Sequence, residues 1–326
     1  MGLQITAIVE RWPVAGQFVI SRGAKDHVDV LVVAVGDGTH VGLGEGTAIY
    51  YHGETAESCL AQVMNVVADI EQLNVRQARA LTQELLGPGA ARNALDCALW
   101  DLEARQTGQP LWQLIGMVHP PQSLETAFTI SLAEPEVMEV AAQKAAAKGY
   151  GLLKLKLTGH GDRERVAAVR AGAPDARLIV DANESWSDLD IAEETEALEE
   201  LGVEMIEQPV PVGADALLDT VHAPLPFLAD ESCQDTTDVA RIGAFYDGVN
   251  IKLDKAGGLT EALRLADAAD AAGLKIMVGC MLSTSLGIAP AFLVAQRAMW
   301  VDLDGPALLA RDRDHGFRFE NGKIIA

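Results

Sequence analysis

Alternating apolar and polar residues mark the first fifty positions of the chain. The segments LQITAIVE (3–10) and VDVLVVAV (28–35) alternate over much of their length, and the turn sequence GDGT (36–39) follows the second. Alternation with a period of two is typical of strands that bury one face. The pattern predicts a small antiparallel sheet, with GLGEG (42–46) as a tight bend within it.

The spacing of apolar residues then changes to three and four, from Thr55 to about Gln106. Such a spacing places apolar side chains on one face of an amphipathic helix. The clearest set is Ala91, Leu95, Ala98, Leu99 and Leu102. We therefore expect an α+β domain over residues 1–117.

From about Thr126 onward, short apolar runs alternate with Ala-rich helical runs. The residues that end the apolar runs are separated by gaps of 25, 25, 26, 23, 22, 27 and 23. They are Ser131, Lys156, Asp181, Glu207, Asp230, Lys252, Gly279 and Asp302. Apolar runs of this kind are typical of parallel strands buried on both faces, and eight strand–helix units can close into a TIM-type barrel. We expect an α/β barrel over residues 118–304.

The last 22 residues, 305–326, contain no obvious full-length helix. Their sequence HGFRFENGKI places an Asn-Gly turn between two short strands. We expect this C-terminal tail to return to the N-terminal domain.

Composition narrows the range of partners. The 326 residues include 47 acidic and 25 basic side chains, which gives a net charge of −22. A surface this acidic repels phosphate backbones and anionic membranes, so neither nucleic acid nor membrane is an expected partner. The four cysteines are scattered, and the N-terminus lacks the pattern of a secretory signal, which together predict a cytoplasmic protein. The oligomeric state stays open, a homo-oligomer included.

The predicted strand ends are sorted by charge. Strands 3, 4 and 5 end in Asp181, Glu207 and Asp230, whereas strands 2 and 6 end in lysines. Any one of these residues, taken alone, is explained as a solvated rim residue. Three adjacent carboxylates, however, repel one another unless a cation neutralises them, and oxygen ligands without Cys or His favour Mg²⁺. The sequence therefore predicts Mg²⁺ bound by these three residues.

The two lysines at strand ends, Lys156 and Lys252, are four strands apart and therefore face each other across an eight-stranded barrel. Between them, a metal-bound substrate carboxylate would stabilise the enediolate that forms when the adjacent carbon loses its proton. One lysine would remove the proton and the other would return one to the opposite face. Each lysine must be neutral for part of the time, which a nearby Mg²⁺ promotes by lowering its pKa.

This set of residues resembles the muconate-lactonising subgroup of the enolase superfamily. That pattern has K-x-K on strand 2 (here Lys154 and Lys156), Asp, Glu and Asp on strands 3 to 5, and Lys on strand 6. The resemblance implies an N-terminal capping domain and a (β/α)7β barrel. It also implies that Lys156 and Lys252 are the acid/base pair and that Lys154 contacts the substrate carboxylate. Strand 7 ends in GCMLSTS, without the His of the mandelate racemase branch.

Strand 8 resembles the dipeptide epimerases within that subgroup. Its sequence DLDGP is similar to their Asp-x-Asp, so Asp302 and Asp304 are expected to bind the free ammonium group of a dipeptide. Strand 8 lies opposite strand 4, so a short zwitterion would extend across the barrel mouth to the metal. For one of the two aspartates, a second interpretation stays open: it caps the turn that follows.

A loop arginine suggests the substrate class. Arg22 in ISRG resembles the arginine with which L-Ala-D/L-Glu epimerases bind the glutamyl side chain, and weaker similarities assign substrate contacts to Thr129 and the backbone of Met281. The resemblance implies a Mg²⁺-dependent isomerase that epimerises acidic dipeptides, with a role in recycling cell-wall peptides.

Two alternatives remain at this point. One is another reaction of the same subgroup, cycloisomerisation or o-succinylbenzoate synthesis, whose substrates lack the ammonium group that Asp302 and Asp304 would bind. The other is a non-catalytic ligand-binding barrel, which would not need two opposed lysines.

Overall fold

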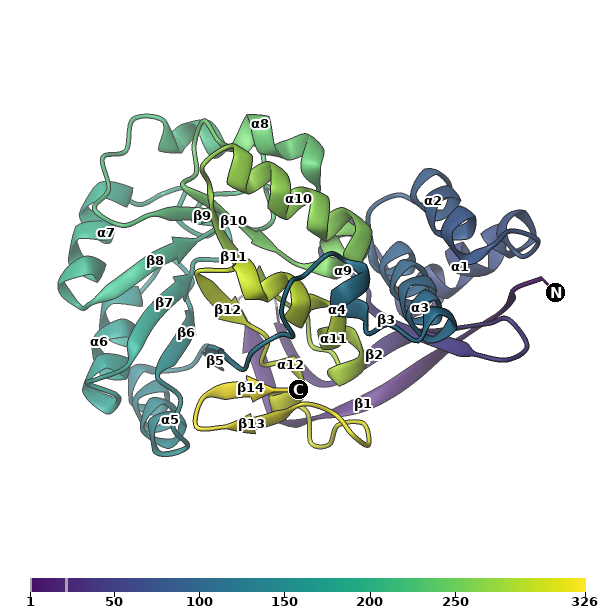
Figure 1. The fold of residues 1–326 in the computed structure, drawn as a ribbon. Helices are drawn as coiled ribbons and strands as arrows, with labels where there is room; N and C mark the ends of the chain where they lie inside the picture. The colour runs from purple at the N-terminus through teal and green to yellow at the C-terminus, as the bar shows by residue number, and fades with distance from the viewer. Residues whose placement is uncertain (1, 21–22) are drawn as a thin grey trace.

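The computed structural model describes residues 2–20 and 23–326 and contains two structural units (Figure 1). A three-stranded sheet and a group of helices form the first unit, and an eight-stranded parallel sheet with outer helices forms the second. Within the described residues, no helix is long and apolar enough to cross a membrane.

The N-terminal unit, which we call the cap, is an antiparallel sheet covered by helices. Its strands pair in the order β1 (Gln4–Ile20), β2 (Gly23–Gly36) and β3 (Val41–Thr47). The segments that follow are η1 (Tyr50–His52), α1 (Ala56–Ile70), α2 (Val75–Leu85), α3 (Ala90–Thr107) and α4 (Leu111–Leu114). The apolar stripe predicted for 91–102 is buried on α3, as expected.

The glycines of GLGEG have a different role from the one predicted. The segment lies inside β3, so the predicted bend is wrong. These glycines let α3 lie directly on the strand: a Cβ atom at Gly44 would be 2.1 Å from the carbonyl oxygen of Ala94. A larger residue would therefore separate α3 from the sheet.

The C-terminal unit is a nearly closed barrel of eight parallel strands, which confirms the predicted fold. Adjacent strands follow chain order from β5 to β12. At the seam between the first and last strands, the Ala127 N–H donates to the Val301 carbonyl over 2.8 Å. The strands are β5 (Phe128–Ile130), β6 (Leu152–Lys156), β7 (Arg177–Asp181), β8 (Val203–Glu207), β9 (Phe227–Ala229), β10 (Gly248–Ile251), β11 (Lys275–Gly279) and β12 (Trp300–Asp302).

Helices of unequal length connect the strands on the outside of the barrel. The β8–β9 and β9–β10 connections contain only short helical segments, whereas each of the other crossovers contains a helix of 10 to 13 residues. The segments are α5 (Pro135–Ala147), α6 (Asp162–Gly172), α7 (Ile191–Glu200), η2 (Asp215–Leu218), η3 (Thr236–Asp238), α8 (Val239–Ile242), α9 (Leu253–Ala256), α10 (Leu259–Ala271), α11 (Ser285–Val294), η4 (Ala295–Arg297) and α12 (Gly305–Leu308).

An apolar floor fills the inside of the barrel. It consists of Ala127, Leu152, Ile179, Met205, Leu228, Met277 and Trp300. Because side chains of a strand alternate between its two faces, the residue two positions later points to the same interior. Two positions after Leu152, Ile179 and Met205, the chain has Lys154, Asp181 and Glu207. The polar strand ends therefore form a layer above a packed apolar one.

The C-terminal tail contacts both units. Leu309 forms an isolated β-bridge with Val14 of β1, and Arg313 pairs with Glu10 and Glu45 at 2.7 and 2.8 Å. The final hairpin, β13 (Arg318–Glu320) and β14 (Lys323–Ile325), instead pairs with β4 (Leu124–Glu125), directly before the barrel.

A buried carboxylate of the barrel joins the cap to it through hydrogen bonds. Asp254 of α9 accepts hydrogen bonds from the Thr47 N–H and from Asn93 Nδ2, both over 2.8 Å. Thr47 ends β3 and Asn93 belongs to α3, so one oxygen holds two cap elements. Three residues after Thr47, η1 begins, and these contacts fix its position above the barrel mouth.

Candidate active site

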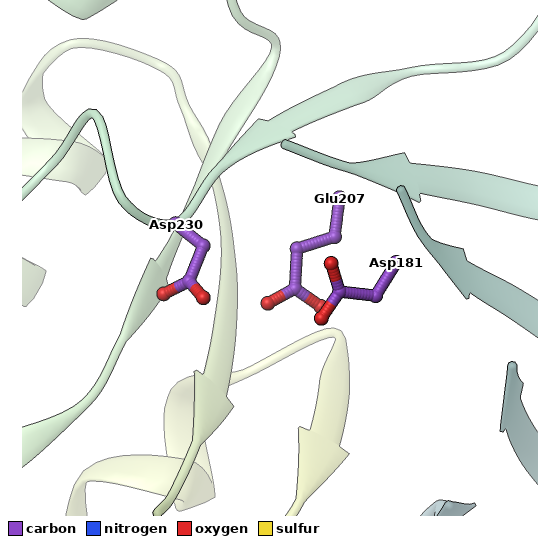
Figure 2. A group of neighbouring side chains, drawn as sticks. All are labelled: Asp181, Glu207 and Asp230. Atoms are coloured by element: carbon purple, nitrogen blue, oxygen red, sulfur yellow. The ribbon is translucent and has the colours of Figure 1, made fainter. Parts of the chain in front are cut away.

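Three carboxylates converge at the C-terminal ends of neighbouring barrel strands. Asp181 and Glu207 end β7 and β8, and Asp230 follows β9 directly. Figure 2 shows their carboxylate groups directed toward one another. One oxygen from each lies within 4.8 Å of the others, and all three side chains are buried. The structure thus brings together the three residues that were predicted from strand spacing.

The carboxylates of this cluster differ in how easily they ionise. Burial and the adjacent Asp181 raise the pKa of Glu207 to about 7. Burial also acts against ionisation of Asp230, but Lys252 and Lys255 outweigh it and hold that pKa well below its ordinary value. A bound cation would stabilise the ionised form of Glu207, whose pKa burial and Asp181 raise.

The hydrogen bonds of the cluster also fit a bound cation. Glu207 Oε2 and Asp230 Oδ1 are buried without a well-aligned hydrogen bond. The ammonium groups of Lys154 and Lys255 lie only 2.6 and 2.7 Å from these oxygens, so the contacts are ion pairs of poor alignment. Hard carboxylate oxygens with spare lone pairs fit a divalent cation such as Mg²⁺.

Lysines from β6 and from the residue after β10 surround the carboxylates. Lys156 Nζ lies 2.5 Å from Asp181, and Lys252 Nζ lies 2.6 Å from Asp230. Lys154 Nζ contacts Glu207 at 2.6 Å and also Asp302 at 2.9 Å. Burial acts to lower the pKa of Lys252, but attraction to Asp230 and Glu207 outweighs it and keeps the pKa well above its ordinary value.

Three residues that sequence reasoning missed hold the carboxylates in place. Lys255 is fully buried and pairs with Asp230, while its ammonium group also donates to the carbonyls of Cys233 and Asn250 over 2.9 and 3.1 Å. Asn250 Nδ2 donates to Glu207 over 2.7 Å. The KLDK sequence around Lys252 was a usable signal for Lys255, because a second lysine one helical turn onward faces the same region.

The third missed residue is Gln208, which joins the ends of β8 and β9. Its Oε1 accepts the N–H groups of Asp230 and Ser232 over 2.9 and 3.0 Å. Its backbone has φ 39°, a left-handed conformation that is strained for a residue with a side chain. The buried amide therefore sets where the Asp230 backbone lies, although a glutamine between a carboxylate and a proline gives no such signal in sequence.

A cavity opens above the carboxylates and is lined by both units. Its empty volume is about 670 Å³, including the part open to solvent. Lys156 and Lys252 both line it, as do the other predicted contacts Thr129, Lys154 and Met281. Arg22 lies outside the described residues. The cap adds residues that the sequence did not single out: Phe18, Lys25, Tyr50 and Tyr51.

Asp302 and Asp304, two positions apart in the chain, line the same cavity. Asp304 occupies the N-cap position of α12, but its side chain makes no capping hydrogen bond. Its carboxylate instead accepts the Thr129 N–H over 2.7 Å. Burial and repulsion from Asp302 raise the pKa of Asp304 to about 7. The pair is therefore a second anionic centre, and the capping interpretation does not fit the Asp304 side chain.

Comparison with protein-family models assigns the chain to a family. Residues 3–116 match the mandelate racemase / muconate lactonizing enzyme N-terminal domain, and residues 136–326 match the enolase C-terminal domain-like model. The chain belongs to this family of the enolase superfamily, which confirms the resemblance drawn from the strand-end residues.

The relatives of this chain include several dipeptide epimerases. The L-Ala-D/L-Glu epimerase of Escherichia coli K12 is 44% identical over 315 residues, which cover 97% of each chain. An Agrobacterium tumefaciens enolase family member with homology to dipeptide epimerases, solved with sodium and L-Ala-L-Glu, is 46% identical with a TM-score of 0.93, over 99% of this chain and 97% of that one. The Cytophaga hutchinsonii dipeptide epimerase, solved with Mg and D-Ala-L-Val, is 26% identical with a TM-score of 0.93, over 100% of this chain and 94% of that one.

Proposed function

We propose that this protein is a Mg²⁺-dependent dipeptide epimerase that acts on L-Ala-D/L-Glu. The observation that supports this most directly is the placement of Lys156 and Lys252: they come from opposite sides of the barrel, yet line one cavity above a three-carboxylate cluster. The Escherichia coli relative, which shares nearly the whole chain, is named for this activity, and the Agrobacterium tumefaciens protein was solved with L-Ala-L-Glu.

Asp181, Glu207 and Asp230 are the proposed ligands of Mg²⁺. When bound, the ion would neutralise the substrate's α-carboxylate and the additional charge that develops there as the neighbouring carbon loses its proton. Lys154 lies beside Glu207 and is the proposed second contact to that carboxylate. The contacts of Lys255, Asn250 and Gln208 hold these three carboxylates in position.

Lys156 and Lys252 are the proposed acid/base pair. One takes the α-proton from one face of the substrate, and the other, in its ammonium form, returns a proton to the opposite face, which inverts the centre. Lys252 now owes its high pKa mainly to Asp230 and Glu207. A divalent cation on these carboxylates would cancel this attraction, so that Lys252 could lose its proton more easily.

Asp302 and Asp304 are the proposed site for the substrate ammonium group. Burial and the neighbouring Asp302 raise the pKa of Asp304, and a cationic ligand would stabilise its ionised form. This location favours dipeptides over substrates of cycloisomerases or o-succinylbenzoate synthases, which have no ammonium group. Thr129 and Met281 line the space between the two anionic centres.

For the acidic side chain of the substrate, Arg22 is the proposed contact, as the sequence resemblance implies.

We keep the proposed domain limits of 1–117, 118–304 and 305–326, and the end of the first family match at 116 supports the first limit. We also propose a cytoplasmic location, because all four cysteines are free.

Proton exchange tests the function directly. The protein with Mg²⁺ is incubated with L-Ala-L-Glu in D₂O, and NMR follows the glutamyl α-hydrogen and the appearance of the second epimer. We expect both exchange and epimerisation, and their loss when a chelator removes the metal. Absence of exchange with L-Ala-L-Glu and with a library of other dipeptides would contradict the proposal. If Arg22→Ala leaves the preference for acidic dipeptides intact, the role of Arg22 is wrong although the function stands.

A further inference from the structure

The loop between β11 and α11, residues 280–284, forms one side of the cavity and is held by residues from outside the barrel. Its first three residues, Cys280, Met281 and Leu282, line the cavity. The Leu282 carbonyl accepts a hydrogen bond from Thr47 Oγ1 of the cap over 2.9 Å. The loop therefore contacts the cap on one side and faces the substrate space on the other.

Glu45 of β3 is the second cap contact of this loop. Thr284, the residue before α11, donates from its N–H to Glu45 over 2.7 Å and from its hydroxyl group to the same carboxylate. The Glu45 side chain has no exposed surface, and burial raises its pKa. A buried carboxylate remains ionised only where a cation and hydrogen-bond donors compensate for the lost water.

The cation beside Glu45 comes from the C-terminal tail. Arg313 Nη2 lies 2.8 Å from Glu45 and 2.7 Å from Glu10 of β1. Its Nε donates to the Thr284 hydroxyl group over 2.6 Å, and its guanidinium group lies over the Trp12 ring, 5.0 Å from the centroid. Among the described residues, Arg313 forms the only ion pair of Glu45. One side chain of the tail thus contacts β1, β3 and the loop at once.

We propose that Arg313 is a positioning residue for substrate binding, which acts through Glu45 and Thr284 to keep the 280–284 loop in place against a bound dipeptide. The inference rests on the proposed function, in which Met281 contacts the substrate. Without the guanidinium group, the buried Glu45 loses its counter-charge and is drawn toward water. Thr284 donates twice to this carboxylate and moves with it.

The loop passes such a shift on to the cavity wall because it is packed closely on its other side. A Cβ atom on Gly305 would be 2.9 Å from the Met281 carbonyl oxygen, so α12 lies directly against the loop. The Ser283 hydroxyl group also donates to the Met281 carbonyl over 3.1 Å. Movement of Thr284 therefore changes the position of Met281, which lies three residues earlier.

Steady-state kinetics with L-Ala-L-Glu separate this role from general structural support. Loss of a contact made equally to substrate and transition state raises KM alone, whereas loss of folded protein lowers the apparent kcat and leaves KM unchanged. We expect Arg313→Met to raise KM about tenfold with kcat within about twofold, and Arg313→Lys to keep KM within about threefold. Asp312 accepts the Ser285 N–H over 2.9 Å and still joins the tail to α11 in these variants.

Arg311→Met is the matched control. Arg311 lies over the same Trp12 ring, 5.3 Å from the centroid, but forms no ion pair with any described residue. This substitution removes an arginine two positions away in the same tail, and it should leave both KM and kcat unchanged. For all variants, Mg²⁺ should still raise the melting temperature, because the three carboxylates of the barrel are not altered.

A double-mutant cycle tests the route through Thr284. Thr284→Val removes the hydroxyl group that joins Arg313 to the loop and keeps the N–H bond to Glu45. We expect it to raise KM about threefold, and the double variant to have no higher KM than Arg313→Met alone, because both changes break one link. Increases in KM that multiply would show that the two residues act independently, which overturns the inference.

The outcomes distinguish this inference from the proposed function. If the wild-type protein exchanges the α-hydrogen of no dipeptide, the proposed function fails, and this inference fails with it. If the wild-type protein epimerises L-Ala-L-Glu but Arg313→Met keeps KM within about twofold, Arg313 supports the fold only and the function stands. If circular dichroism shows that Arg313→Met does not fold, Thr284→Val decides, and an unchanged KM in that variant overturns the inference.

Discussion

The barrel wall and the cap wall of the cavity are built on different physical principles. The barrel wall contains charged groups at strand ends that are buried and ion-paired, such as Lys154, Lys156 and Asp230. The cap wall consists of Phe18, Lys25, Tyr50 and Tyr51, which come from a hairpin and a short 3₁₀ segment. The first wall provides fixed charges for proton transfer. The second provides apolar and aromatic surface and, among the residues that the structure describes, one lysine without an ion pair.

This difference assigns turnover to the barrel and substrate preference to the cap. Buried charges are expensive to move, because each one left without its partner costs several kcal/mol. Strand ends in a closed barrel keep such charges at fixed mutual positions, as proton transfer requires. Loops and hairpins tolerate substitution, so the cap can vary the substrate while the barrel keeps the reaction. We therefore expect substitution of the lysines and metal ligands of the barrel to lower kcat, and substitutions in the cap to change KM or substrate preference.

Substitution of the paired lysines should have the largest effect. Lys156→Met and Lys252→Met remove an amine while keeping most of the side-chain volume, and each should lower kcat for epimerisation about 1000-fold. Each variant keeps one base, so α-hydrogen exchange in D₂O should persist for one epimer only, with the opposite epimer in each variant. NMR of both epimers measures this directly.

The control for the lysine variants is the metal site. Mg²⁺ should still raise the melting temperature of both variants, because the three carboxylates are unchanged. If either variant still exchanges both epimers, the two-base assignment is wrong. Loss of the thermal response to Mg²⁺ would instead assign these lysines to the support of the metal site.

The barrel wall was also far easier to predict from sequence than the cap wall. The regular gaps between strand ends locate Asp181, Glu207 and Asp230, because parallel strands in a barrel end at a common edge. No such period connects Phe18 or Lys25 to that edge. Their place depends on how far a long hairpin reaches and on contacts of Val19 with the barrel, which are properties of the tertiary structure.

The residues that hold the carboxylates in position could not be predicted from sequence, for a related reason. Gln208 acts through its amide contacts to two backbone N–H groups of the next strand end, and sequence shows only a polar residue between Glu207 and Pro209. GLGEG was misread because alternating glycines look like a bend when the helix that packs on them is unknown. In both cases the partner that gives the residue its role is distant along the chain.

The ammonium site should give an intermediate effect with a distinct pH dependence. Burial and Asp302 raise the pKa of Asp304 to about 7. Above this pH the carboxylate is ionised and binds the substrate ammonium group, and below it the carboxyl is neutral and attraction weakens. KM for L-Ala-L-Glu should therefore rise as pH falls through about 7, while Asp304→Asn should raise KM about 30-fold at higher pH and flatten the profile.

The matched substrate for the ammonium site is N-acetyl-L-Ala-L-Glu, which has no ammonium group. Steady-state kinetics should show that Asp304→Asn does not raise its KM. Because the amide introduced by Asp304→Asn would still offer an oxygen to the Thr129 N–H, a loss of fold is not expected, and circular dichroism checks this. An equal rise in KM for both substrates would assign Asp304 to the support of β5 rather than to ammonium binding.

The smallest effect on catalysis is expected at the contact between the cap and the barrel. Asp254 holds Thr47 and Asn93 of the cap, and burial raises its pKa to about 7. Asp254→Asn keeps an oxygen for both donors and should change little, whereas Asp254→Ala should raise KM about threefold and lower the free energy of unfolding by about 1 to 2 kcal/mol. Steady-state kinetics and urea unfolding measure the two quantities. A drop in kcat comparable to that of Lys252→Met would show that cap placement controls proton transfer as well, and the separation between the two walls would then be lost.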